Sequence, residues 1–146
     1  MCDCIFCKIV KGEIPNYTIY EDTNTLAFLD ISKDYYGHTL VIPKKHYANI
    51  FDINETTLNN VLKTVKKVST HYKNIGFEGI NILNNNGECA GQSVHHFHIH
   101  IIPRKHNDGE KVLNTTTEHE YNLEEIKNKL FLKIWHWFID FLNSFW

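Results

Sequence analysis

The sequence predicts an α+β fold with an antiparallel five-stranded sheet, and two observations support this prediction. The chain has 146 residues, of which 42% are hydrophobic, which is enough for one domain with a substantial core. Short β-branched and aromatic runs also flank a single long stretch whose apolar residues recur at helical spacing. The expected elements are three strands, then a helix, then two further strands. This succession is typical of α+β proteins.

The first expected element is a short helix close to the N-terminus. Ile5, Phe6 and Ile9 supply its apolar stripe. Gly12 lies just past its end, and Pro15 prevents its continuation.

Three short strands are expected next, at residues 17–22, 25–30 and 37–43. The first two are separated by turn-forming residues, which predicts a hairpin. The third is entered through Gly37 and closed by Pro43, a residue that cannot donate to a strand ladder.

A long helix is expected between residues 51 and 76, because apolar side chains recur there at spacings of three and four. Asp52 or Asn54 can cap its N-terminus, and Gly76 follows its C-terminus. The expected core-facing residues are Leu58, Val61, Leu62, Val65, Val68 and Tyr72.

Residues 79–83 and 95–103 are the last two expected strands, joined by a glycine-containing loop at residues 84–93. After Arg104 the chain becomes polar and then, from residue 121, helical and unusually aromatic.

We therefore divide the chain into a domain at residues 1–110 and a C-terminal extension at 111–146, a polar loop followed by an aromatic helix. Residues 131–146 are fewer than the ~20 needed to span a bilayer. We expect them to pack on the sheet or across a dimer, with a peripheral membrane contact as the alternative.

Three histidines, His96, His98 and His100, alternate with apolar residues in the last expected strand. A period of two places their imidazoles on one side of a strand, with neighbours roughly 6.6 Å apart. One metal ion with nitrogen ligands at ~2.0–2.1 Å could bind two neighbours but hardly all three. The histidine row is therefore expected to serve more than one purpose.

The formal net charge of −2 suggests neither a nucleic-acid nor a membrane partner, and the N-terminus lacks a secretory signal. A cytoplasmic protein is expected, in which disulfides are unusual. Cys4 and Cys7 form a C-x-x-C pair that could be structural thiols, a redox pair or half of a metal site. Because the βαβ context of redox pairs is absent and histidines such as His46 are in excess, a Cys₂His₂ zinc site is favoured.

The loop at residues 84–93 offers Asn85, Gln92, Ser93 and the backbone amides of residues 91–93. Amides directed at one point form an anion site, so this loop can surround a phosphate. The alternative is an ordinary connection between two strands.

The segment from His96 to Ile102 matches the pattern His-φ-His-φ-His-φ-φ, where φ is apolar, and resembles the histidine-triad (HIT) family. "CIFCKIVKGEIP", "LAFLDIS", "GHTLVIPKKH" and "AGQSVHHFHIHIIPR" resemble its nucleotide-binding branch, including zinc-carrying microbial members. The likeness extends from about Cys4 to Arg104 and leaves the aromatic tail uncovered.

This resemblance implies a hydrolase that cleaves purine nucleoside 5′-phosphoramidates, or adenylylated amines, to the nucleoside monophosphate. His98 would attack the α-phosphorus and form a covalent nucleotidyl-histidine. His100 would contact the phosphate, His38 would support the network, and Ser93 would help to protonate the departing amine. There are two alternatives. One is hydrolysis of dinucleoside polyphosphates, and the other is a nucleotide-binding regulatory or scaffolding role with slow turnover. Ser93 favours the phosphoramidase.

The resemblance also implies nucleotide contacts, a structural zinc ion and a homodimer whose two sheets join. Asp30 would accept hydrogen bonds from the ribose. His96, at the outer end of the row, would turn away from the nucleotide to bind zinc. The implied zinc ligands are Cys4, Cys7, His46 and His96, and the implied nucleotide contacts are Ile5, Phe6, Ile9, Phe28, Asp30, Ile31, Asn85, Gln92, Ser93, His98 and His100.

Overall fold

The computed structural model describes residues 3–32, 34–109 and 122–130 of the chain. The contacts divide the chain into two units, residues 1–112 and 113–146. In the second unit the structure describes the helix α3 (Leu123–Leu130), in the segment predicted to be helical. The aromatic residues of the predicted tail, 131–146, lie outside the described residues.

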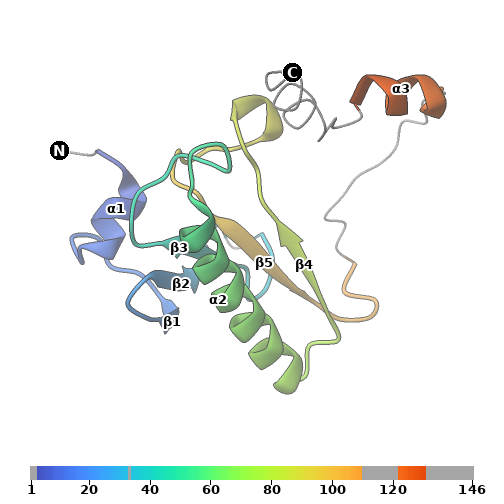
Figure 1. The fold of residues 1–146 in the computed structure, drawn as a ribbon. Coiled ribbons are helices and arrows are strands. Elements are labelled where there is room, and N and C mark those ends of the chain that lie inside the picture. Colours follow the sequence, from blue (N-terminus) through green and yellow to red (C-terminus); the bar gives the residue numbers. More distant parts are fainter. Residues whose placement is uncertain (1–2, 33, 110–121, 131–146) are drawn as a thin grey trace, which may run out of the picture. The chain divides into compact units, whose positions relative to one another are not determined.

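The first unit is built on a five-stranded antiparallel sheet, as the sequence predicts. The order of its strands is β1-β2-β3-β5-β4 (Figure 1). The five strands are β1 (Thr18–Glu21), β2 (Thr25–Leu29), β3 (Thr39–Pro43), β4 (Gly79–Leu83) and β5 (Ile99–Arg104). The helix α1 (Ile5–Val10) precedes the sheet in sequence, α2 (Glu55–Asn74) joins β3 to β4, and a short 3₁₀ turn, η1 (Glu88–Ala90), lies between β4 and β5.

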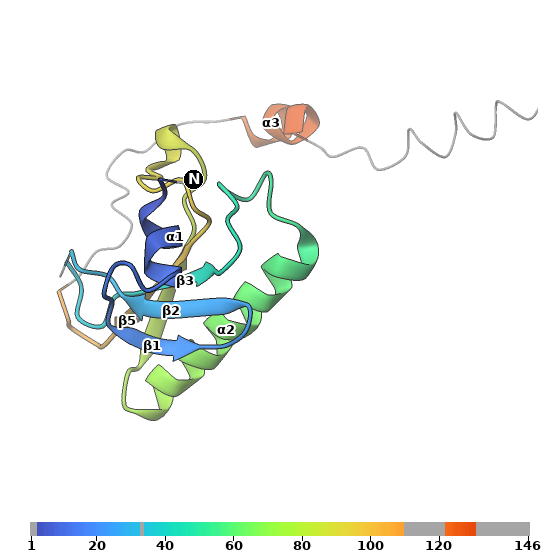
Figure 2. The same cartoon turned by 90° about the vertical axis from the view of Figure 1, so that its left-hand side faces the viewer.

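The two helices cover opposite faces of the sheet, because neighbouring strand residues point to opposite sides. Ala27 and Val41 face α2 and join its buried residues Val61, Val65 and Val68 in one core. Residues of the other parity in β2 and β3 pack with α1 in a second core, and Figure 2 shows the two helices on the two sides of β2. The second core comprises Phe6, Ile9, Leu26, Phe28, Leu40 and Ile42.

Most of the predicted stripe on α2 is buried, but Leu62 is 47% exposed and was wrongly expected to face the core. Leu62 follows Val61, which is fully buried. Neighbouring helical residues point about 100° apart, so one of an adjacent apolar pair lies at the edge of the buried stripe. None of the helices in the described ranges is both long and apolar enough to cross a membrane.

The sequence left two candidates for the N-cap of α2, and the structure selects Asn54. Its side chain accepts a hydrogen bond from the N–H of Thr57 at 2.8 Å. Asp52 instead accepts from the N–H groups of Ala48 and Asn49, both at 2.9 Å, and so shapes the preceding turn.

Replacement of Asn54 by Ala is expected to lower the free energy of unfolding by about 1 kcal/mol, because it leaves a helical N–H without its acceptor. Urea denaturation followed by circular dichroism measures this loss. Asn59→Ala, at an exposed position inside the same helix, is the control and should lose nothing. Equal stability of the two variants would contradict the capping role.

The last strand is shorter than predicted, since β5 begins at Ile99 and leaves His96 and His98 in the preceding irregular segment. Individual hydrogen bonds to other segments take the place of strand pairing in this segment. The N–H of Phe97 donates to the carbonyl of Tyr47 at 2.6 Å, and the side-chain amide of Asn84 donates to the carbonyl of His98 at 2.8 Å. Phe97, Ile99 and Ile101 pack into the same core, so the alternation of side chains continues beyond the end of the paired strand.

Candidate active site

His98 lies immediately before β5 with its ring in a defined orientation. Its Nδ1 lies 2.7 Å from the backbone carbonyl of His96. A carbonyl can only accept, so Nδ1 carries the proton and Nε2 keeps its lone pair. Burial lowers the pKa of His98 below its usual value, and the ring packs edge-on against Phe6 with centroids 5.4 Å apart. The side chain is thus a neutral imidazole with one nucleophilic nitrogen.

His100 is the next imidazole, with its ring centroid 4.9 Å from that of His98. It lies on β5 opposite Leu40 of β3, on the sheet face that α1 covers. Its Nδ1 shares a hydrogen bond with Nε2 of His38 at 2.9 Å. Burial, followed by the nearby His98 and His38, lowers the pKa of His100 to about 4, so it is neutral at pH 7.

His38, at the entrance to β3, brings the carboxylate of Asp30 into this network. Its Nδ1 lies 3.5 Å from Oδ2 of Asp30. Burial lowers the pKa of His38 although Asp30 and Asp34 act in the opposite direction. The pair is therefore a neutral imidazole beside a carboxylate and not an ion pair at neutral pH.

His98 and His100 line a pocket of about 270 Å³ between α1 and the start of β5. Its volume is near the lower end of small-molecule sites, ~300–1,000 Å³. Ser93 also lines this pocket, so the structure brings it to the two imidazoles. Of the other predicted nucleotide contacts, the pocket is lined by Ile5, Phe6, Ile9, Phe28, Asp30 and Ile31.

Gln92 and Asn85 are not among the described residues that line the pocket. The Gln92 side chain is buried and donates to the carbonyls of Ala48 and Val94 at 2.6 and 3.0 Å. Its oxygen accepts from the N–H of Gly87 at 2.8 Å. Gln92 thus fastens the loop to the segment after β3, a role that its position in the sequence does not reveal.

The sequence analysis missed six of the residues that line the pocket, of which Leu29 and Val94 are next to predicted ones in the chain. Leu40 pairs with Phe28 across β2 and β3, so the strand register places them side by side. A prediction of the register between β2 and β3 would have identified Leu40. The missed residues in loops have no comparable pattern in the sequence. The missed residues are Ile14, Pro15, Asn16, Leu29, Leu40 and Val94.

A second cluster consists of Cys4, Cys7, His46 and His96, the four residues that the resemblance to the HIT family implied as metal ligands. Nδ1 of His96 lies 3.5 Å from Sγ of Cys4, 3.7 Å from Sγ of Cys7 and 3.2 Å from Nδ1 of His46. The His46 Nδ1 lies 3.3 Å from Sγ of Cys7. A tetrahedral zinc ion requires about 3.5 Å between sulfur and nitrogen ligands and about 3.3 Å between two nitrogens. The four side chains thus fit around one such ion.

Local structure orients these ligands. Cys4 is the N-cap residue of α1 and Cys7 lies in its first turn, so the two thiols lie on one side of the helix. Nε2 of the buried His96 donates to the carbonyl of Pro43 at 2.8 Å, which leaves Nδ1 as the lone-pair nitrogen. Burial lowers the pKa of His96 to about 4, which favours the neutral ligand form.

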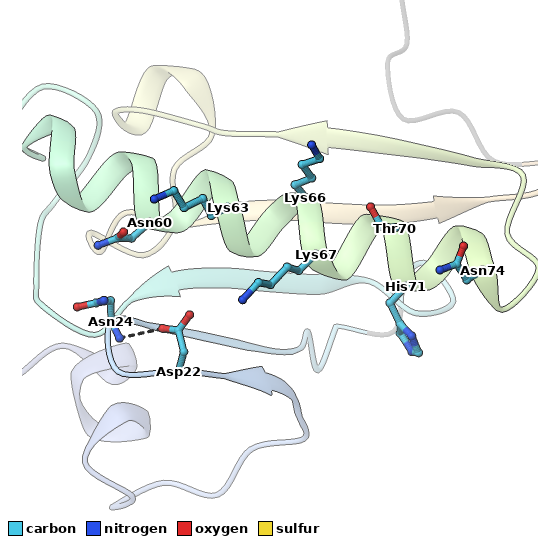
Figure 3. A pocket seen from close by; sticks show the side chains of 9 residues that line it. All are labelled: Asp22, Asn24, Asn60, Lys63, Lys66, Lys67, Thr70, His71 and Asn74. Carbon is cyan, nitrogen blue, oxygen red and sulfur yellow. Dashed lines mark hydrogen bonds between the residues drawn. The ribbon is translucent and has the colours of Figure 1, made fainter.

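Another groove, of about 590 Å³, lies along α2 and the β1–β2 turn (Figure 3). None of the predicted site residues lines it. Lys63, Lys66 and Lys67 extend from the helix around it, and Lys67 donates to the hydroxyl of Tyr20 at 2.8 Å. Since the predicted catalytic residues line the other pocket, we place the candidate chemistry at the histidines.

Fold and site together define a class of small α+β proteins in which a histidine triad lies at the start of the last strand of an antiparallel sheet. The chain belongs to the HIT family: the model of the HIT domain matches residues 11–107.

Three known proteins illustrate this relationship. Adenosine 5′-monophosphoramidase of Schizosaccharomyces pombe is 50% identical over 101 residues, which cover 69% of this chain and 74% of the relative. A HIT family protein of Bacillus subtilis is 44% identical in its crystal structure, with a TM-score of 0.77 and coverage of 88% and 92%. A zinc-bound histidine triad protein of Mycobacterium smegmatis is 35% identical, with a TM-score of 0.73 and coverage of 79% and 84%.

Proposed function

We propose that this protein hydrolyses purine nucleoside 5′-phosphoramidates, or adenylylated amines, to the nucleoside monophosphate. The observation that supports this most strongly is the neutral His98, which lines an apolar pocket while its Nδ1 is held by the carbonyl of His96. A relative named as an adenosine 5′-monophosphoramidase supports the same substrate class.

In the proposed reaction Nε2 of His98 attacks the α-phosphorus, and the bond from phosphorus to the substrate amine breaks. The departing amine takes up a proton with the help of the Ser93 hydroxyl, which lines the same pocket. Water then attacks the phosphorus, the proton that it loses restores the Ser93 hydroxyl, the bond to Nε2 breaks, and His98 is restored. The short bond between His100 and His38 holds both rings in place beside the phosphate.

The apolar wall of the pocket suits a planar base. Ile5, Phe6 and Phe28 line the cavity, where a purine can displace water. Asp30 lines the same pocket, and a carboxylate is a suitable acceptor for the two ribose hydroxyls. A nucleotide therefore fits with its ribose near Asp30 and its phosphate near His98.

A direct comparison of substrates tests this proposal against its alternatives. Turnover of adenosine 5′-phosphoramidate, turnover of a dinucleoside polyphosphate and binding of AMP would be measured on one preparation. We expect the phosphoramidate to give the highest kcat/KM. Faster cleavage of the dinucleotide would favour the second reaction, and tight AMP binding without turnover would favour a regulatory role.

Replacement of Ser93 by Ala is expected to lower kcat by roughly 10²–10⁴-fold. The loss should be larger for poor amine leaving groups than for acidic ones, because only the former need the proton. Ser69→Ala is the matched control, since Ser69 lies in α2 and does not line the pocket. An equal loss for all leaving groups would contradict the role of Ser93 as a proton donor.

We further propose that the cluster of Cys4, Cys7, His46 and His96 holds one structural zinc ion. The ligand spacings described above and the zinc-bound relative support this assignment. Zinc there would crosslink α1 to the segments after β3 and before β5 and take no part in the chemistry. The homodimer and the cytoplasmic location remain predictions from the sequence.

A further inference from the structure

One polar side chain of the nucleotide pocket has no role in the proposed reaction. Five of the described residues that line this pocket have polar side chains. The proposal assigns four of them, Asp30 to the ribose and Ser93, His98 and His100 to the reaction at phosphorus. The fifth is Asn16, which is half-buried and lies two residues before β1. Its place relative to the sheet indicates which part of a nucleotide it meets.

Paired residues of four neighbouring strands form a row that leads from the histidines to β1. His100 of β5 is opposite Leu40 of β3, which is opposite Phe28 of β2. Phe28 is in turn opposite Thr18 of β1. Neighbouring strands lie ~4.8 Å apart, so Phe28 is roughly 10 Å from His100 along this row and Thr18 is roughly 14 Å from it. In this row β1 is therefore the strand furthest from the histidines.

Asn16 and Asp30 adjoin β1 and β2 at the same end of the two strands. The N–H of Leu29 donates to the carbonyl of Tyr17 at 2.9 Å, and Asp30 and Asn16 are the next residues of the two segments. Asn16 adjoins β1, which is one strand further from the histidines than β2. In a nucleotide the ribose separates the phosphate from the base. A nucleotide with its phosphate at the histidines and its ribose at Asp30 therefore extends its base towards Asn16.

The Asn16 side chain has a hydrogen-bond donor available for a base. Its Oδ1 accepts from the hydroxyl of Thr18 at 2.7 Å, which fixes the orientation of the amide. Its Nδ2 has no hydrogen-bond partner among the residues that the structure describes. An amide nitrogen donates and does not accept, so its partner on the base must be an acceptor. Adenine presents acceptors at N3 and N7, and guanine at N7 and O6.

We propose that Asn16 recognises the base, with its Nδ2 donating one hydrogen bond to an acceptor at the edge of a purine. This assignment rests on the proposed function, which places a nucleotide in the pocket. Apolar contacts with Ile5 and Ile9 hold a planar base without selecting its edge, because they are not directional. The amide of Asn16 selects the edge, so Asn16 determines specificity against bases that lack an acceptor there.

Binding of AMP and of ribose 5-phosphate, which lacks the base, tests this assignment. In Asn16→Leu the affinity for AMP should fall by roughly 3–10-fold, the effect of one neutral hydrogen bond. The affinity for ribose 5-phosphate should not change, since leucine has a similar branched shape and lacks only the polar atoms. Calorimetric titration of the full-length protein measures both affinities.

Asn16→Asp separates a contact with the base from a structural role of Asn16. Aspartate keeps an acceptor for the Thr18 hydroxyl and has no Nδ2. AMP affinity relative to ribose 5-phosphate should therefore fall as it does in Asn16→Leu, and the ratio removes the effect of the added charge on the phosphate. An unchanged ratio in Asn16→Asp would show that the residue serves only to hold Thr18.

Analogues of AMP in which one ring nitrogen is replaced by carbon identify the acceptor. These are 1-deaza-, 3-deaza- and 7-deaza-AMP. One of the three should bind the unaltered protein more weakly than AMP does and should lose nothing further in Asn16→Leu, because the hydrogen bond is already missing. Equal losses for AMP and all three analogues in this variant would overturn the proposal.

Asn24→Leu is the matched control, because the exposed Asn24 lies in the turn between β1 and β2 and is not among the described residues that line the pocket. It should bind AMP as the unaltered protein does. Unchanged AMP affinity in Asn16→Leu would refute the role of Asn16 and leave the proposed function intact. Failure of the unaltered protein to bind AMP would refute the proposed function itself, and the assignment of Asn16 with it.

Discussion

Replacement of His98 by Asn is expected to lower phosphoramidase turnover by roughly 10³-fold or more while AMP still binds. The substitution removes the imidazole Nε2 of His98, whose lone pair is free because Nδ1 is held by the carbonyl of His96 at 2.7 Å. The apolar wall and Asp30 are unchanged, so nucleotide affinity should be preserved. Steady-state kinetics and calorimetric AMP titration measure the two effects separately.

His95→Asn is the matched control for His98, because the exposed His95 is not among the residues that line the pocket. It should leave turnover almost unchanged. Rapid quenching of the unaltered enzyme with a radiolabelled nucleotide substrate should trap the label on His98. Full activity of His98→Asn, or label recovered on Ser93 or a cysteine, would refute the covalent mechanism.

Replacement of His96 by Ala is expected to release zinc and to lower the free energy of unfolding by more than about 2 kcal/mol. His96 is fully buried, and its Nδ1 lies within 3.7 Å of both thiols and of the His46 nitrogen. The substitution removes one of four ligands and leaves a cavity between α1 and the sheet. Elemental analysis of purified protein and urea denaturation with and without a chelator measure the two losses.

Cys89→Ser is the matched control for the metal cluster, since Cys89 is an exposed free thiol in η1, outside the four ligands. It should keep its zinc and its stability, whereas Cys7→Ser should behave like His96→Ala. Protein prepared under reducing conditions that contains no zinc, and whose stability a chelator does not change, would refute the structural metal.

The same histidine also connects the metal cluster to catalysis. The carbonyl of His96 accepts the proton of His98 Nδ1, while the His96 ring belongs to the metal cluster. Loss of zinc would therefore loosen the residue that sets the tautomer of His98. We expect kcat of His96→Ala to fall more than its affinity for AMP, which distinguishes misorientation of His98 from loss of the pocket.

The elements of the first unit were predictable because their signals are local. The apolar spacing of α2, the turn between β1 and β2 and the short helix before Gly12 each depend on neighbours in sequence. The antiparallel arrangement of the strands was also predicted from the succession of elements, whereas the order of the strands in the sheet was not. Leu62 and the start of β5 were mispredicted because burial and strand pairing depend on partners distant in the chain.

The sequence by itself determined which residue types were available for the site: alternating histidines, a C-x-x-C pair and a serine in a glycine-containing loop. The resemblance implied how they divide between two sites. In the structure His96 groups with the cysteines and His98 lines the pocket, because both precede the paired strand and their rings meet different neighbours. Only the tertiary structure decided that the Gln92 side chain holds its own loop, and it leaves Nδ1 of His38 beside Asp30 with no hydrogen-bond partner among the described residues. These outcomes depend on contacts between β3, β5 and α1, and side-chain contacts of this kind are set by packing rather than by spacing along the chain.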